Sequence, residues 1–302
     1  MSQQADRPLS PPVTREDVEH RIALIGAWLA RRIGAEQQQW LRDQLDRIGG
    51  EGNKTALAMA IGLAPRRLGS ALLALDASEA EAAGGQVPGL DTRDWTVDQV
   101  GRILFLLASF DGDEAAFVQR LETVQRDGEL GEQIALLRGL ALFPAPVGLM
   151  GIAGEGIRSA MQPVFEAVAH RNPYPAAHFS EPMWNQMVVK TLFIDSTLGP
   201  IQGLDERRNA DLARMLVDYA HERWAASRSV SPELWRCVGP FAANDYFADL
   251  LRVFRSGNAI ERKAAALAIS ECPTPQALTA LETAPTLWRD IRAGRVGWDD
   301  LQ

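Results

Sequence analysis

The sequence has few of the residues that build disulfide frameworks or metal centres. Its 302 residues include two cysteines, Cys237 and Cys272, and four histidines. Two isolated cysteines without a C-x-x-C spacing argue against a disulfide-stapled secreted fold and against a structural zinc site. We therefore expect a cytoplasmic protein kept in a reducing compartment, with no metal and no cofactor.

Long apolar runs and basic clusters are also missing. No stretch of about 18 consecutive apolar residues occurs, so we expect no membrane insertion. Residues 1–13 are polar and contain prolines, which predicts a disordered tail and no signal peptide. The formal net charge is −8, from 39 acidic and 31 basic residues. An acidic chain without a Lys/Arg cluster lacks the electrostatic footprint of nucleic-acid binding, so no nucleic acid is expected as a partner.

What the sequence does contain is a helical pattern. Alanine and leucine are abundant, and apolar residues recur at three- and four-residue steps, as in Val18, Ile22 and Ile25. No segment alternates with period two, which predicts an absence of strands. Thr96–Gln99 matches a capping box and predicts a helix that runs through Leu107.

Two other local predictions follow from proline and from small polar residues. Pro65 suits the first turn of a helix, where its missing amide hydrogen costs nothing, so we expect a helix to begin there. The stretch Ala77–Asp91 is small and polar and contains Gly84-Gly85, which favours a loop.

The C-terminal part resembles one pair of a helical repeat. An apolar helix ends at Gly257, and a basic, alanine-rich helix striped by Ile260, Ala264 and Leu267 follows. Since a helix pair cannot bury its apolar stripe alone, stacking against neighbouring pairs is expected. The predicted fold is all-α, with stacked antiparallel helix pairs forming a HEAT-like α-solenoid around a non-repetitive central helical segment; the alternative is an irregular helical bundle.

This pattern divides the chain into four expected parts. They are a disordered tail (1–13), N-terminal helical repeats (14–150), a central signature segment (151–243) and C-terminal HEAT-like helices (244–302).

The central segment contains a helix, about 181–194, that is apolar around nearly its whole circumference and should be buried. Asn185, Gln186 and Lys190 interrupt it. Buried amides need partners, and a buried ammonium needs a carboxylate or an anionic ligand. These residues therefore form either the polar floor of a pocket or a structural network, with Lys190 reaching solvent in the second case.

The next predicted helix, about 210–226, has Asn209 as its cap. Its polar face gathers Arg214, Asp218, His221 and Glu222 at spacings of three and four residues, so these side chains can touch. A histidine beside a carboxylate can act as a general base, although many such clusters are only solvated surfaces.

Other motifs are incomplete. His221-Glu222 lacks the second histidine of a zinc-protease helix, because Ala225 and Ala226 follow. Gly154-Glu155-Gly156 lacks the third glycine and the strand of a dinucleotide loop. Cys237 has no neighbouring motif of a nucleophile and is expected to be a small buried hydrophobe.

The strings Arg171–Pro175, Trp184–Lys190, Ile201–Arg207, Leu212–Trp224 and Ser231–Arg236 resemble the EboA family of bacterial proteins. The resemblance implies membership of a secondary-metabolite biosynthetic cluster, whose other members resemble sugar and isoprenoid enzymes. It implies no settled reaction for this protein.

Three functions are compatible with these residues. In the first, an enzyme or binding protein holds a small polar metabolite such as a phosphorylated cyclitol or sugar. His221 oriented by Asp218 would move a proton, and the expected ligand-binding residues are His170, Asn172, Asn185, Gln186, Lys190, Asp205, Arg207, Arg214 and Glu222. In the second, the chain is a non-catalytic scaffold for other enzymes of the cluster. In the third, it carries a metabolite without chemistry.

Overall fold

The structure is a computed structural model that describes residues 13–49, 54–243 and 245–301. The predicted tail, 1–13, thus lies almost entirely outside the described residues. No strand occurs in the described ranges, where one isolated backbone bridge joins Leu72 to Thr96. The all-α prediction is confirmed. The chain forms two compact units, Met1–Phe179 and Ser180–Gln302, which are described separately.

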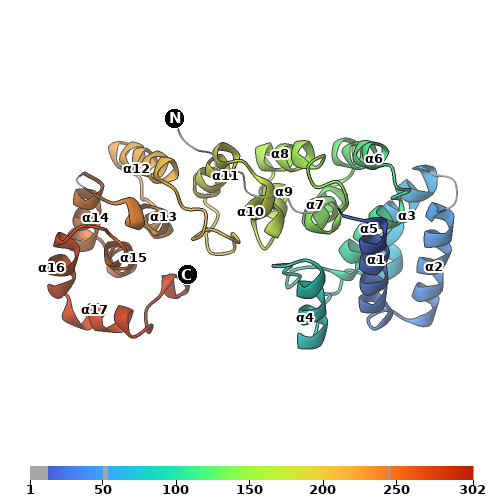
Figure 1. Cartoon of the computed structure of the whole chain (residues 1–302), viewed down its shortest axis with the longest axis horizontal. Coiled ribbons are helices and arrows are strands. Elements are labelled where there is room, and N and C mark those ends of the chain that lie inside the picture. The colour runs from blue at the N-terminus through green and yellow to red at the C-terminus, as the bar shows by residue number, and fades with distance from the viewer. Residues whose placement is uncertain (1–12, 50–53, 244, 302) are drawn as a thin grey trace. The chain divides into compact units, whose positions relative to one another are not determined.

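The first unit is a row of packed helices (Figure 1). Helices α3, α5, α7 and α9 contact one another in succession; α1 and α2 flank α5, and α6 and α8 flank α7. The helices are α1 (Arg15–Ala30), α2 (Ala35–Gly49), α3 (Lys54–Leu68), α4 (Ala77–Gln86), α5 (Val97–Ala108), α6 (Glu114–Asp127), α7 (Leu130–Arg138), the 3-10 helix η1 (Gly139–Leu142), α8 (Met150–Arg158), α9 (Gln162–Ala169) and α10 (Pro173–His178).

Helix α5 is the centre of this unit. Its capping box is present as predicted, with Thr96 as N-cap and Gln99 reaching back to the cap amide. Residues from Val100 to Leu107 are buried on every side, which is the property of a core helix. At Gly101 a Cβ atom would overlap the side chain of Leu68, so the glycine permits the close approach of α3.

Two local predictions in this unit are wrong. The expected loop over Ala77–Asp91 contains α4, because Asp76 and Glu79 form a capping box that starts a helix despite Gly84-Gly85. Pro65 does not open a helix but lies within α3. A proline there leaves the carbonyl four residues earlier without its helical donor. That carbonyl, of Ile61, instead accepts a hydrogen bond from Arg102 Nε at 3.1 Å.

The second unit is built around α15. Its elements are α11 (Glu181–Phe193), α12 (Ala210–Ala225), the 3-10 helix η2 (Pro232–Leu234), α13 (Trp235–Val238), η3 (Gly239–Phe241), α14 (Asp245–Ser256), α15 (Ala259–Ser270), α16 (Gln276–Glu282), α17 (Pro285–Arg292) and η4 (Trp298–Leu301). Helix α15 packs against α13, α14 and α16. At Gly239 a Cβ atom would lie 2.6 Å from the backbone oxygen of Ala268, so this glycine allows the backbones to touch.

The predicted pair of helices on either side of Gly257 is observed as α14 and α15, packed together. The two predicted central helices are α11 and α12, with Asn209 as the N-cap of α12. The HEAT-like solenoid stays a prediction, since the successive packing within each unit establishes helical stacking without the repeat geometry.

Candidate functional site

The residues predicted to form the site are divided between the two units. His170 and Asn172 belong to the first unit, and the others belong to the second.

Asn185 serves as a joint between α11 and α12. Its amide nitrogen donates to Asn209 Oδ1 at 3.1 Å, and Asn209 returns a bond to Asn185 Oδ1 at 2.9 Å. Asn209 Oδ1 also accepts from the backbone N–H of Leu212 at 2.8 Å, which caps α12. Asn185 is buried, and its partner is another structural amide. Its contacts therefore match the structural-network interpretation.

The prediction that α11 is buried all round is wrong. Gln186 is exposed, and the Phe193 side chain is 70% exposed, so one face of the helix meets solvent. Lys190 is half-buried, and desolvation lowers the pKa of its ammonium group below the ordinary value. The sequence places apolar residues on nearly every side of α11, but the neighbouring elements leave one face of the helix exposed.

Arg207 and Asp205 have partners within the second unit. The guanidinium of Arg207 lies 4.6 Å from the centroid of the Trp184 ring, a cation–π contact. Asp205 accepts two bonds from Arg236, at 2.8 and 2.7 Å, and these hold the pKa of the Asp205 carboxyl below its usual value. This pair of hydrogen bonds connects the turn before α12 with α13.

The polar face of α12 is exposed and does not form the expected acid–base pair. His221 Nε2 lies 2.7 Å from Asp249 Oδ2 of α14. Asp218 instead pairs with Arg214, with 3.7 Å between the charged atoms, and Glu222 is exposed. The pairing of His221 with Asp218 is therefore corrected to Asp249. Spacing along one helix brings the two residues near, but α14 supplies a better-placed carboxylate.

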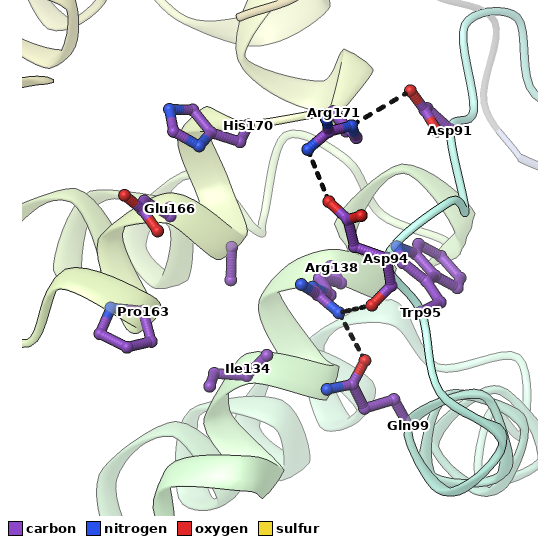
Figure 2. A pocket seen from close by; sticks show the side chains of 11 residues that line it. Asp91, Asp94, Trp95, Gln99, Ile134, Arg138, Pro163, Glu166, His170 and Arg171 are labelled. Carbon is purple, nitrogen blue, oxygen red and sulfur yellow. Dashed lines mark hydrogen bonds and ion pairs between the residues drawn. The ribbon is translucent and has the colours of Figure 1, made fainter. Parts of the chain in front are cut away.

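A polar cleft of about 230 Å³ lies in the first unit, where the segment before α5 meets α7 and α9 (Figure 2). His170, the C-cap residue of α9, is the one predicted site residue that lines it. The other lining residues come from three regions of the chain: Asp91, Asp94, Trp95, Gln99, Ile134, Arg138, Pro163, Glu166, Ala167 and Arg171.

Arg138 supplies a positive charge that no hydrogen-bonded carboxylate offsets. Its Nη1 donates to the backbone oxygen of Asp94 at 2.7 Å and to Gln99 Oε1 at 2.6 Å, and both acceptors are neutral. Burial lowers the pKa of the guanidinium, the nearby Asp94 carboxylate opposes this shift, and the charge of Arg171 adds to it. Gln99 can accept this bond because the α5 capping box already fixes its side chain. An anionic ligand would relieve the cost of this desolvated cation.

Arg171 lies near Arg138 and is held by two acidic residues. Its Nη1 lies 2.5 Å from Asp94 Oδ2, and its Nε lies 3.7 Å from Asp91 Oδ2 (Figure 2). The backbone of Arg171 adopts a left-handed conformation, φ 49°, which is uncommon for a residue with a side chain. Strained residues of this kind cluster at functional sites.

Asn172 fixes this strained turn. Its buried amide donates to the backbone oxygens of Leu137 and Ala167, at 2.9 and 3.0 Å. Its Oδ1 accepts from the backbone N–H of Tyr174 at 3.1 Å and caps α10. Asn172 thus positions the residues that precede it, and its amide group already donates hydrogen bonds to two backbone oxygens.

The cleft is suited to binding. Guanidinium groups are natural partners of carboxylates and phosphates, and Glu166 and His170 add hydrogen-bonding groups. Its lining contains no serine, threonine, cysteine or lysine to act as a nucleophile. In the described parts of the chain, no group of three His, Cys, Asp or Glu side chains is arranged to hold a metal ion.

The sequence pointed to some of the residues that line the cleft and not to others. Arg171 stands at the start of the Arg171–Pro175 string, so it belonged to a recognisable motif. Arg138, Asp94 and Gln99 lie outside the strings and were missed, because nothing in their spacing shows that the chain brings them to one cleft.

The described residues are all-helical in their regular structure, and the first unit contains a small polar cleft lined by two arginines and three acidic residues. The chain belongs to the EboA family: the family model, described as "Metabolite traffic protein EboA", matches residues 21–239. This match covers most of the chain and extends across both units. Neither the comparison with curated proteins nor that with solved structures finds a match. Across the described ranges, every helix is too short or too polar to cross a membrane.

Proposed function

We propose that this protein binds and carries a small polar metabolite with an anionic group, and that the ligand occupies the cleft beside Arg138 and Arg171. The observation that carries the proposal is the desolvated guanidinium of Arg138, whose two acceptors are neutral. The volume, about 230 Å³, lies below the roughly 300–1,000 Å³ typical of drug-sized ligand sites, so a small metabolite is favoured. The family description, which names metabolite traffic, supports carriage rather than turnover.

A phosphorylated sugar or cyclitol fits these features. Its phosphate would receive hydrogen bonds from Arg138, and its hydroxyl groups would face Glu166, His170 and Gln99. Phosphate also competes well with Asp94 for Arg171, because guanidinium groups bind both anions with paired hydrogen bonds.

Calorimetry on the full chain tests this proposal with D-glucose 6-phosphate as probe and D-glucose as its uncharged match. We expect the phosphorylated sugar to bind at least tenfold more tightly, and Arg138→Gln to remove that difference. Arg15→Gln changes an exposed arginine of α1 and is the control, with no expected effect. Equal binding of the two sugars, or unchanged binding by Arg138→Gln, would contradict the proposal.

The enzyme hypothesis rests on the second unit, with His221 as base and Lys190, Arg207, Asn185, Gln186, Asp205, Arg214 and Glu222 as ligand-binding groups. His221 would then act with Asp249 rather than Asp218. Single His221→Ala and Lys190→Ala variants that fold but lose turnover of a cluster metabolite would support it over carriage.

A scaffold function is favoured by one observation, a groove of about 630 Å³ in the first unit. Its apolar residues include Ile152 and Val164, and Arg126, Glu155 and Arg158 are among its charged ones. A partner enzyme of the cluster would be captured by the native chain and lost in Arg158→Glu, with Arg138→Gln unaffected. The HEAT-like arrangement is part of this hypothesis, because helical stacks present extended binding surfaces.

A further inference from the structure

The second unit contains a cavity of about 350 Å³ that the proposed function does not use. It lies where α11 and α12 end and α15 begins. Its lining includes charged side chains of both signs and several hydroxyl groups. Among the lining residues are Leu192, Asp195, Ser196, Thr197, Tyr219, Arg223, Ser229, Ser231, Glu233 and Glu261.

Both helices end here in the same unusual way. After α11, the backbone N–H of Ser196 bonds to the oxygen of Thr191 at 2.9 Å, and that of Asp195 bonds to the oxygen of Leu192 at 3.2 Å. This pair of bonds is a Schellman motif, whose left-handed position usually holds glycine. Here the position is occupied by Asp195, with φ 56°.

Helix α12 repeats the motif. The N–H of Arg228 bonds to the oxygen of Arg223 at 2.8 Å, and the N–H of Ser227 bonds to the oxygen of Trp224 at 2.9 Å. Ser227 takes the left-handed position, also with φ 56°. Two adjacent helix ends thus bear polar side chains where glycine would be less strained.

Asp195 is solvent-exposed, and its position at the end of α11 is unfavourable in two respects. The left-handed backbone strains any residue with a Cβ atom, and the C-terminal end of α11 carries partial negative charge. Within the described residues its carboxylate makes no hydrogen bond or ion pair, and it lines the cavity. A bound cation would offset both the helix dipole and the unpaired charge.

Arg223 supplies the opposite charge in the same cavity. Its Nε donates to the backbone oxygen of Ser229 at 2.8 Å, and its guanidinium lies over the Tyr219 ring at 5.9 Å. No described carboxylate forms an ion pair with it. The other acids of the cavity are committed: Glu233 accepts from the backbone of Leu198, and Glu261 accepts from that of Asn258.

We propose that this cavity is a second ligand site, which takes a small zwitterion of the amino-acid type. The ammonium group of the ligand would pair with Asp195 at the end of α11, and its carboxylate with the terminal nitrogens of Arg223. The Asp195 carboxylate and the Arg223 guanidinium line one cavity without forming an ion pair with each other. They are therefore complementary to a molecule that bears both charges.

Calorimetry on the full chain tests the proposal with three probes of similar size. L-Serine bears both charges, ethanolamine lacks the carboxylate, and L-glycerate has a hydroxyl in place of the ammonium with the same configuration. We expect saturable binding of L-serine and at least tenfold weaker binding of the other two. No saturable binding of L-serine, or equal affinity for all three probes, overturns the proposal.

Two substitutions of Asp195 separate binding from folding. Asp195→Asn keeps the shape of the side chain, and asparagine tolerates the left-handed backbone conformation at this position. The variant should weaken L-serine binding at least tenfold. Asp195→Gly should also abolish binding while raising the melting temperature, because glycine removes the strain and the charge. Asp218→Asn, an exposed acid of α12 outside the cavity, is the control and should bind normally. Normal binding by Asp195→Asn overturns the proposal.

Discussion

Arg102 donates through Nε to the carbonyl oxygen of Ile61, which is the oxygen that Pro65 cannot satisfy. The same guanidinium lies 3.5 Å from Asp98 Oδ2, and both charged side chains are less than 10% exposed. A proline in the last turn of α3 is thus compensated by a buried cation on α5, which links two closely packed helices of the first unit.

This relationship predicts a coupling between Arg102 and Pro65. Arg102→Met should lower the free energy of unfolding by about 3–5 kcal/mol, because it removes the cation paired with the buried Asp98 carboxylate and leaves that charge with the Thr96 hydroxyl. In a Pro65→Ala background the loss should be smaller by about 1 kcal/mol, since the alanine N–H can donate to Ile61. Urea unfolding of the four proteins measures the coupling, and equal losses in both backgrounds would contradict it.

The loss of folding stability at acidic pH should depend on Glu79. Hydrogen bonds from Arg32, the largest effect, and from the Asp76 backbone lower the pKa of Glu79 to about 2. In the unfolded chain the ordinary value is 4.5, so the unfolded state binds more protons between these two values. The stabilisation is therefore complete above about pH 4.5 and is lost as the pH falls toward 2.

Glu79→Gln should remove this pH dependence while lowering stability at neutral pH. Thermal unfolding followed between pH 7 and 3 provides the measurement. A Glu81→Gln variant, which changes a neighbouring exposed acid of α4, is the control. If the native protein and Glu79→Gln lose stability in parallel on acidification, Glu79 does not anchor α4.

The amide pair of Asn185 and Asn209 should behave as one unit. Asn185→Ala removes both bonds between the two amides and leaves Asn209 with the backbone groups of Arg207 and Leu212, so we expect a loss of about 1–2 kcal/mol in unfolding free energy. Asn209→Ala should cost a similar amount, and the double variant should cost less than the sum of the two. Additive losses in denaturant unfolding would show that the two amides act independently.

Glycine at position 239 is expected to be required for packing of the second unit. In Gly239→Ala the new methyl group would meet the Ala268 backbone, which cannot rotate away, so unfolding free energy should fall by about 3 kcal/mol. Gly84→Ala in α4 is the matched control because a Cβ there meets nothing within 4 Å. It should raise stability by about 0.5–1 kcal/mol, the usual gain from replacing glycine inside a helix. Equal effects of the two substitutions on the melting temperature would argue against the close contact.

The sequence by itself determined the helical character of the chain and several of its boundaries. Capping residues such as Thr96 and Asn209 act on the backbone within three residues, and apolar spacing acts over one or two turns, so both are local signals. Glu79 shows the limit of applying them, because its capping box outweighed the small residues that suggested a loop.

Only the tertiary structure decided which polar residues share a site. The approach of Arg138 to Asp94 joins residues 44 positions apart, and Asp249 displaced Asp218 as the partner of His221 from another helix. Spacing along one helix shows which side chains can meet, but it does not show which distant element covers them. Burial, ion pairing and the cavities depend on that long-range packing, and so does the choice between a binding group and a structural one.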